Sequence, residues 1–261
     1  MAAKKPQSPS GAERNPSPPA PRLVGKVAVV TGGSRGIGYA IAHALAAEGC
    51  SVVITARNSR KLAAAARQLS SAIRRRRPRI VPQVCDVRDP QAVEALFAEV
   101  KRCFGRLDIL VNNAGITQPV ATVEETPLEV WQDLIATNLT GMFLCTRAAL
   151  PLMRPGASIV NNLSAAAKQV FPNYAAYTAA KAGALGFTLS LRQELIPRGI
   201  RVTALMPGAT ATDMWDQIMP DAPRNRMIDR GSVAQAVLYA VLLPPNANLS
   251  ELMLDPARGA L

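Results

Sequence analysis

The sequence predicts an α/β fold in which a doubly wound, seven-stranded parallel sheet is covered by helices on both faces. From Lys26 onward, short apolar runs rich in β-branched residues alternate with longer amphipathic stretches, as in parallel sheets with helical crossovers. A glycine-rich segment follows the first run directly and leads into a helical stretch. The 261 residues, 49% of them hydrophobic, suit one domain with a large core.

Each element is predicted from the spacing of its apolar residues. Continuous apolar runs indicate strands buried on both faces, at residues 26–31, 51–56, 80–87, 107–115, 157–164, 200–208 and 251–255. Between them, apolar residues recur with a helical period, which predicts helices at residues 38–49, 60–73, 93–105, 130–153, 176–195 and 232–243. Right-handed crossovers between these strands place ligands in the loops at their carboxyl ends.

The chain is expected to comprise a tail, residues 1–22, and a single domain, residues 23–261. The tail is rich in Pro, Ser and Ala and has almost no large apolar side chains, so we expect it to be disordered. No apolar run approaches the ~20 residues of a membrane span, and the start of the chain lacks a hydrophobic signal segment. The four cysteines are scattered, as in a reducing compartment. We therefore expect a soluble, cytoplasmic protein with no membrane partner.

The net charge of +12 suggests nucleic acid, but its distribution does not. The basic block at residues 74–79 closes an alanine-rich helical stretch, where cations interact favourably with the helix dipole. Aromatic residues are only 4% of the chain and none is interleaved with this block, so we predict no nucleic-acid partner. A single histidine, His43, makes a His-rich metal site or a Ser-His-Asp hydrolase untenable unless that one residue serves. We expect no metal.

The first strand runs into "TGGSRGIG", residues 31–38. Glycines at positions 32, 36 and 38 allow a tight turn and a close backbone approach to a pyrophosphate, which the start of the next helix then faces. At the end of the second strand, where such folds read the adenine ribose, the chain has Thr55 and Arg57 but no acid. Arg57, with Arg35 in the glycine turn, suits a 2′-phosphate, so we predict NADP(H) as the cofactor.

The stretch "NYAAYTAAK" places Tyr174, Tyr177 and Lys181 at spacings that would align them along one helical stripe. One reading is a surface stripe in which the lysine stem covers an aromatic ring. The other is acid catalysis, because a nearby positive charge lowers the pKa of a phenol by favouring the phenolate. The motif by itself leaves both readings open.

Several motifs in order resemble those of the classical short-chain dehydrogenase/reductase family, over about residues 24–255. They are "TGGSRGIG", "CDV", "NNAG", "NLTG", a serine after the fifth strand, "YTAAK" and "PGATATDM". The resemblance implies a Rossmann-like fold and a catalytic tetrad formed by Asn138, Ser164, Tyr177 and Lys181. Together with the glycine turn, it gives the expected cofactor-binding set: Gly32, Ser34, Arg35, Gly36, Ile37, Gly38, Arg57, Asp86, Val87, Asn113, Ala114, Gly115, Tyr177, Lys181, Pro207, Gly208 and Thr212.

By this resemblance, Tyr177 would give a proton to a carbonyl oxygen that Ser164 holds, and Lys181 would lower the phenol pKa and bind the nicotinamide ribose. Asn138 would position a water that returns protons to the site. Tyr174 lies outside the motif and would be either a wall of the substrate pocket or helix packing. We therefore expect an enzyme, an NADP-dependent oxidoreductase with a small-molecule carbonyl or alcohol substrate. The alternative is a non-catalytic, NADP(H)-binding regulatory protein of the same fold.

The residues after the sixth strand are expected to determine substrate specificity. Met214, Trp215, Ile218 and Met219 would either roof an apolar pocket or form the buried side of a short helix. A basic residue, Arg198, is a weak indication of a 3-oxoacyl reductase, and a general carbonyl or aldehyde reductase fits equally well. We expect a homo-oligomer, dimer or tetramer, although the ending "LMLDPARGAL" departs from the family's common Gly-Gly pair.

Overall fold

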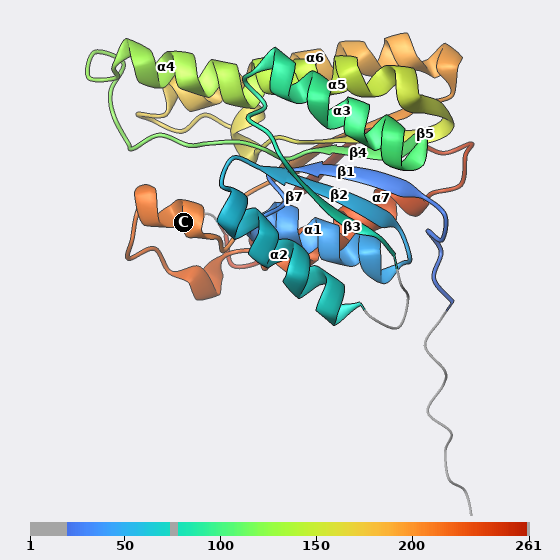
Figure 1. Ribbon diagram of the computed structural model, residues 1–261. Helices are drawn as coiled ribbons and strands as arrows, with labels where there is room; N and C mark the ends of the chain where they lie inside the picture. The colour runs from blue at the N-terminus through green and yellow to red at the C-terminus, as the bar shows by residue number, and fades with distance from the viewer. Residues whose placement is uncertain (1–19, 74–77, 260–261) are drawn as a thin grey trace, which may run out of the picture.

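The structure is a computed structural model that describes residues 20–73 and 78–259 (Figure 1). Its strands form one parallel sheet in the order β3-β2-β1-β4-β5-β6-β7, so the predicted doubly wound α/β fold is confirmed. The chain order reverses between β1 and β4, which puts the switch point, and hence the expected ligand site, beside their carboxyl ends. The strands are β1 (Val27–Thr31), β2 (Ser51–Ala56), β3 (Ile80–Val84), β4 (Leu107–Asn112), β5 (Met153–Asn162), β6 (Arg201–Pro207) and β7 (Glu251–Leu254).

Helices cover both faces of this sheet, as Figure 1 shows: α1, α2 and α7 lie on one side and α3, α4, α5 and α6 on the other. Each face has its own apolar core, represented by Ile41 and Leu69 on the first side and by Leu96 and Leu191 on the second. The helices are α1 (Gly36–Ala47), α2 (Ser59–Ala72), α3 (Pro90–Phe104), α4 (Leu128–Ile135), α5 (Gly141–Ala149), α6 (Ala175–Leu195) and α7 (Arg230–Leu242). The central strands β1 and β2 are nearly continuous apolar runs because both of their faces are buried.

Several boundaries differ from the sequence-based expectation by a few residues, and three differences are larger or bear on the site. The single helix expected at residues 130–153 is divided by a π-helical turn, Ala136–Thr140, that separates α4 from α5. Strand β5 begins at Met153, four residues early, because Met153 pairs with Leu107 before an irregularity in the ladder. Tyr174 precedes α6 rather than lying on it: its backbone angles, φ −128° and ψ 24°, are not helical, so the expected three-residue stripe is wrong at its first member.

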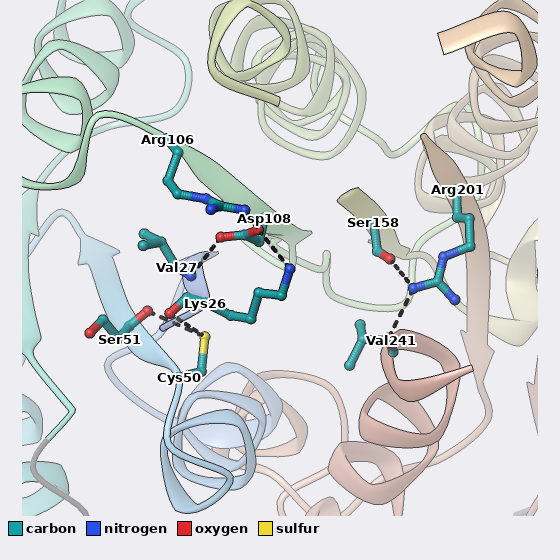
Figure 2. Close-up of polar contacts among 9 residues, drawn as sticks. All are labelled: Lys26, Val27, Cys50, Ser51, Arg106, Asp108, Ser158, Arg201 and Val241. Carbon is teal, nitrogen blue, oxygen red and sulfur yellow. Dashed lines mark hydrogen bonds and ion pairs between the residues drawn. The ribbon is translucent and has the colours of Figure 1, made fainter. Parts of the chain in front are cut away.

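Polar side chains join the strands of the sheet at their amino ends (Figure 2). The Asp108 carboxylate accepts hydrogen bonds from the backbone N–H of Val27 at 3.0 Å and from Lys26 Nζ at 3.2 Å. Arg201, at the start of β6, donates to the carbonyl of Val241 at 2.9 Å, where a cation favourably meets the end of α7. These contacts hold the strands together at their amino ends. The candidate site lies at the opposite, carboxyl ends.

The proposed tail lies almost entirely outside the described residues, and so does most of the basic block, at residues 74–77. Arg22, which we had assigned to the tail, contacts the domain: its backbone N–H and its guanidinium both bind the Glu48 carboxylate, at 3.0 Å. Leu23 is buried, so the ordered chain begins before residue 23. No helix in the described part of the chain is long and apolar enough to cross a membrane.

Candidate active site

A cavity of about 840 Å³ opens at the carboxyl ends of the strands, as the switch point requires. Every residue of the expected cofactor-binding set lines it, from the glycine turn after β1 to Thr212 after β6. Three of the four expected tetrad residues, Ser164, Tyr177 and Lys181, line the same cavity. Residues from the ends of six strands, β1 to β6, therefore meet at one place, although the chain separates them by up to 180 positions (Gly32 to Thr212).

The glycine turn is shaped by close backbone packing. Gly32 has φ +67°, a conformation that favours glycine. A Cβ at Gly38 would lie only 2.4 Å from Asn113 Nδ2 and from the carbonyl oxygen of Gly32, so no larger residue fits there. The Asn113 amide donates to the carbonyl oxygen of Thr31 at 2.9 Å and thereby joins the turn to the end of β4. The start of α1 faces the cavity, which suits a pyrophosphate.

Three cations line the adenine end of the cavity, the part between the glycine turn and α2. Arg35 and Arg57 are those that the sequence predicts, and both are exposed. The third, Lys61 in the first turn of α2, is missing from the expected set. It follows Arg57 by four residues at the start of a predicted helix, and this position is the sequence signal that could have identified it. Thr55 is fully buried in β2, whereas Ala56 is partly accessible, so Ala56 is the better position for an acid that would read a ribose.

The Asp86 carboxylate, expected near the adenine, is held by one arginine. Arg88 donates to it from Nε at 3.1 Å and from Nη2 at 2.8 Å, and the backbone N–H of Arg88 adds a bond of 3.0 Å. These hydrogen bonds hold the pKa of Asp86 below its usual value. Arg88 also pairs with Asp133 on α4 at 2.9 Å, so it ties the adenine loop to that helix. No pattern in the sequence predicts this bridge.

The proton-donating end of the cavity is built by α6 and by the segment after β5. Tyr177 and Lys181 lie one helical turn apart, and Lys181 Nζ lies 5.6 Å from the centre of the Tyr177 ring. Lys181 is buried and its Nζ donates to the carbonyl oxygen of Asn162 at 3.4 Å. Ser164, which follows β5, lies near the Tyr177 phenol and acts to lower its pKa. Tyr177, the tyrosine that the family resemblance favours over Tyr174, is thus the one that lies near both Ser164 and Lys181.

Burial sets the pKa values of this pair, whereas the family resemblance implies that Lys181 lowers that of the phenol. Burial raises the pKa of Tyr177 to about 12, and Ser164 opposes this rise without overcoming it. Burial also lowers the pKa of Lys181 to about 8. In the chain by itself, desolvation of the phenolate sets the direction of the Tyr177 pKa, and the lowering expected from Lys181 stays a prediction.

Asn138 lies in the π-helical turn and, unlike the other tetrad residues, does not line the cavity. It is buried, its Oδ1 accepts from the backbone N–H of Ile116 at 2.9 Å, and its Nδ2 donates to the Ile116 carbonyl oxygen at 3.0 Å. Its side chain thus holds the loop that follows β4. These bonds use one of the two Nδ2 protons and one of the two lone pairs of Oδ1, and the proton-return role stays a prediction.

Gln118, which the sequence analysis missed, supports the catalytic helix from the loop after β4. Tyr174 precedes α6 and offers no capping side chain, so the backbone N–H of Tyr177 lacks a local acceptor. The Oε1 of Gln118 accepts from that N–H at 3.2 Å, and the Gln118 carbonyl accepts from the Tyr174 hydroxyl at 3.2 Å. Gln118 is buried, with only 1% of its surface exposed. A polar residue 59 positions before Tyr177 carries no sequence signal for this contact.

Tyr174 and the apolar residues after β6 form walls of the cavity. The Tyr174 ring meets that of Tyr177 edge to face, with centroids 5.8 Å apart, and it lines the pocket; this answers the question that the sequence left open. The short 3₁₀ helix after β6, Asp213–Gln217, and the residues beyond it contribute the expected apolar lining, which comprises Met214, Trp215, Ile218 and Met219. Among the described residues, no cluster of His, Cys, Asp or Glu could hold a metal ion.

Comparison with known proteins agrees with this site. The family model for short chain dehydrogenases matches residues 26–223, and the chain belongs to that family of oxidoreductases. It is 41% identical over 198 residues to a 3-oxoacyl-[acyl-carrier-protein] reductase of Synechocystis sp., covering 75% of this chain and 78% of the relative. It is also 38% identical over 205 residues to a 3beta-hydroxysteroid dehydrogenase of Mediterraneibacter gnavus, covering 78% and 72%.

The fold agrees with solved structures as well. A short chain dehydrogenase of Burkholderia cenocepacia in complex with NADP has a TM-score of 0.80 and 36% identity, and the match covers 91% of this chain and 98% of that one. The two curated relatives carry different substrate names, an acyl-carrier thioester and a steroid. Similarity alone therefore does not choose a substrate.

Proposed function

We propose that the protein is an NADP(H)-dependent oxidoreductase that reduces a carbonyl, in a ketone, an aldehyde or a 3-oxoacyl group, to an alcohol. One observation carries the proposal: Tyr177, one helical turn from Lys181, lines the same cavity as Ser164 and the glycine turn after β1. A proton donor is thereby held next to a site suited to a dinucleotide. A purely structural phenol would not need to share that cavity.

The residues present fit NADP(H). The glycine turn packs too closely for a Cβ at Gly38, and it presents the start of α1 to the cavity, which suits a pyrophosphate. Arg35, Arg57 and Lys61 offer positive charge at the adenine end, and no acid stands at the end of β2. The Burkholderia relative holds NADP in the same fold, which supports this choice.

The cofactor, when bound, supplies the hydride that reduces the carbonyl carbon. As that carbon is reduced, negative charge develops on the carbonyl oxygen, and the chain must supply a proton there. The Tyr177 hydroxyl is the donor, and its pKa of about 12 ensures that it carries a proton at neutral pH. The Ser164 hydroxyl donates a second hydrogen bond to the oxygen. Lys181, mostly protonated at pH 7, stabilises the phenolate left behind.

An NADPH-oxidation screen across ketones, aldehydes, quinones and 3-oxoacyl thioesters tests this proposal. We expect turnover of at least one class, and none with Tyr177→Phe. A protein that binds NADPH tightly but turns over no carbonyl compound would instead be the regulatory alternative. NADPH binding is therefore measured by titration in the same samples, which separates a non-catalytic protein from one that does not bind the cofactor.

A further inference from the structure

The substrate end of the cavity, the part beyond Tyr177 and Ser164, is walled by apolar side chains from four separate segments. Val120 comes from the loop after β4, Phe171 from the segment after β5, and Trp215 and Met219 from the region after β6. Pro256, two residues past β7, completes the wall with the chain's own C-terminal segment. None of these residues belongs to a hydrophobic core cluster of the described chain, yet all of them line one opening. This arrangement indicates contact with a ligand.

The rim of this opening is unusually exposed for apolar residues. Val120 is 53% exposed, Phe171 41% and Met219 48%. Single exposed apolar side chains are ordinary, whereas several around one concave site mark a surface that binds something apolar. Removing these side chains from water would favour binding of a hydrocarbon body.

Charge around the cavity is divided between its two ends. The cations that line it are Arg35, Arg57 and Lys61 at the adenine end, and the buried Lys181 beside Tyr177. Two further acids line the cavity, Asp213 and Asp255. Asp213 lies beside Arg35, so Asp255 is the acid that lines the substrate end. An anionic group there would meet this carboxylate and, among the described lining residues, no cation other than the buried Lys181.

The two carboxylates differ in their surroundings. Asp213 pairs with Arg35 at 3.7 Å, which offsets its charge. Asp255 has no ion-pair partner among the residues that the structure describes, and its Oδ1 lies 3.6 Å from where a Cβ of Gly208 would stand. Gly208 belongs to the expected cofactor-binding set and Asp255 adjoins Pro256 of the apolar wall, so the Asp255 charge lies beside both the cofactor site and that wall.

We propose, on the basis of the function proposed above, that the substrate is an uncharged ketone or aldehyde with a hydrocarbon body, such as a substituted alicyclic ketone. The apolar rim binds that body while Asp255 disfavours carbonyl compounds that carry a carboxylate, sulfonate or phosphate close to the reacting carbon. Selection therefore acts at the mouth of the cavity, and the proton-donating residues take no part in it.

A matched pair of ketones tests the proposal with the full-length enzyme and NADPH. 4-tert-Butylcyclohexanone and 4-oxocyclohexanecarboxylate share the ring and the carbonyl and differ in one substituent, apolar in the first and anionic in the second. We expect kcat/KM for the neutral ketone to exceed that for the acid at least about tenfold. Equal values, or a preference for the acid, would overturn the substrate class but leave the carbonyl-reductase proposal standing. Failure of both ketones and of every carbonyl compound in the NADPH screen would count against the proposed function itself.

Two substitutions test whether Asp255 and Phe171 discriminate between substrates. Asp255→Asn should raise kcat/KM for the carboxylate severalfold relative to kcat/KM for the neutral ketone, because it removes only the charge. Phe171→Ser should raise KM for 4-tert-butylcyclohexanone while the value for unsubstituted cyclohexanone changes less than about twofold. Tyr239→Ser is the matched control, since Tyr239 is an exposed aromatic residue, 63% accessible, on α7 and not in the cavity. If Phe171→Ser and Tyr239→Ser act alike, the rim does not bind the substrate and the proposal fails.

Discussion

At the scale of single residues, Tyr177 and Lys181 occupy surroundings that favour their neutral forms. Burial raises the pKa of the phenol to about 12 and lowers that of the ammonium to about 8. At neutral pH the tyrosine therefore carries its proton, as a donor for carbonyl reduction must. Lys181 is still mostly charged there, and its charge is the property most easily lost as the pH rises.

The two tyrosines at the start of α6 should differ sharply in their importance. Tyr177→Phe removes the donated proton but keeps the ring, and we expect kcat to fall on the order of 10² to 10⁴ while NADPH still binds. Tyr174→Phe removes a hydroxyl that binds the Gln118 carbonyl, so the expected loss is less than about tenfold. Steady-state kinetics with NADPH titrations measures both. Similar losses in the two variants would show that Tyr177 is not the acid.

The pH dependence of cofactor capture should report Lys181. Its ammonium is charged below its pKa of about 8 and neutral above it, so any contribution of that charge is present at low pH and is lost as the pH rises through 8. We expect kcat/KM for NADPH, which reports the free enzyme, to fall above about pH 8. Tyr177 does not titrate in this range. A profile that stays flat to pH 10 would exclude a role for the charge of Lys181.

Gln118 should position Tyr177 without touching the substrate. Gln118→Leu removes the acceptor for the Tyr177 backbone N–H, and leaving a buried donor unpaired costs about 1–3 kcal/mol. We expect kcat to fall about tenfold, with the Kd of NADPH changed less than about twofold. Gln118→Glu keeps an acceptor at a helix start, where a carboxylate is favoured, and should restore most of kcat. If both variants lose stability and activity equally, the residue is merely structural.

At the scale of elements, the junction between β2 and α2 is expected to set cofactor choice. The end of β2 has no acid to repel a 2′-phosphate, and Arg35, Arg57 and Lys61 line the cavity beside it. Each charge-assisted contact is worth about 1.5–3 kcal/mol, or roughly ten- to a hundredfold in affinity. We therefore expect kcat/KM for NADPH to exceed that for NADH at least about tenfold.

Substitutions at this junction test that preference directly. Arg57→Ala and Lys61→Ala should each weaken binding of 2′,5′-ADP, which carries the 2′-phosphate, and leave NADH binding unchanged. Arg60→Ala is the matched control, because Arg60 is an exposed cation of the same helix that does not line the cavity. Ala56→Asp should shift the preference toward NADH. A wild-type preference near one, or equal effects of Arg57→Ala and Arg60→Ala, would refute the assignment.

The elements also show which features a sequence can reveal. Strands such as Val27–Thr31 were predictable because both faces are buried, so the apolar run is continuous; the glycine turn was predictable because close packing at Gly38 admits no side chain. The contacts of Gln118 and Arg88 were not, because they join segments 59 and 45 positions apart and obey no periodicity. The pKa of Tyr177 could not be predicted from the sequence either, since it depends on how deeply the phenol is buried.

At the scale of the whole molecule, α5 and α6 present a face suited to a second copy of the chain. Phe143 on α5 is 43% exposed, and its ring meets Phe187 of α6 with centroids 6.2 Å apart and lies 5.4 Å from the Arg147 guanidinium. We expect a homo-oligomer that buries this face, and Phe143→Glu should reduce its mass in light scattering. Tyr239→Glu, which places the same charge on α7, should not. An unchanged mass for Phe143→Glu would exclude this face as the contact.

The central claim is that the cavity brings a reduced nicotinamide and the proton of Tyr177 to the same carbonyl. Its most direct test is the transfer of deuterium from [4,4-²H₂]NADPH to a ketone at pH 7, followed by mass spectrometry of the product alcohol. The account predicts one deuterium on the former carbonyl carbon with the wild-type enzyme, and a rate of labelling lower by on the order of 10² or more with Tyr177→Phe that still binds NADPH. An unlabelled alcohol, or equal labelling by both proteins, would contradict it.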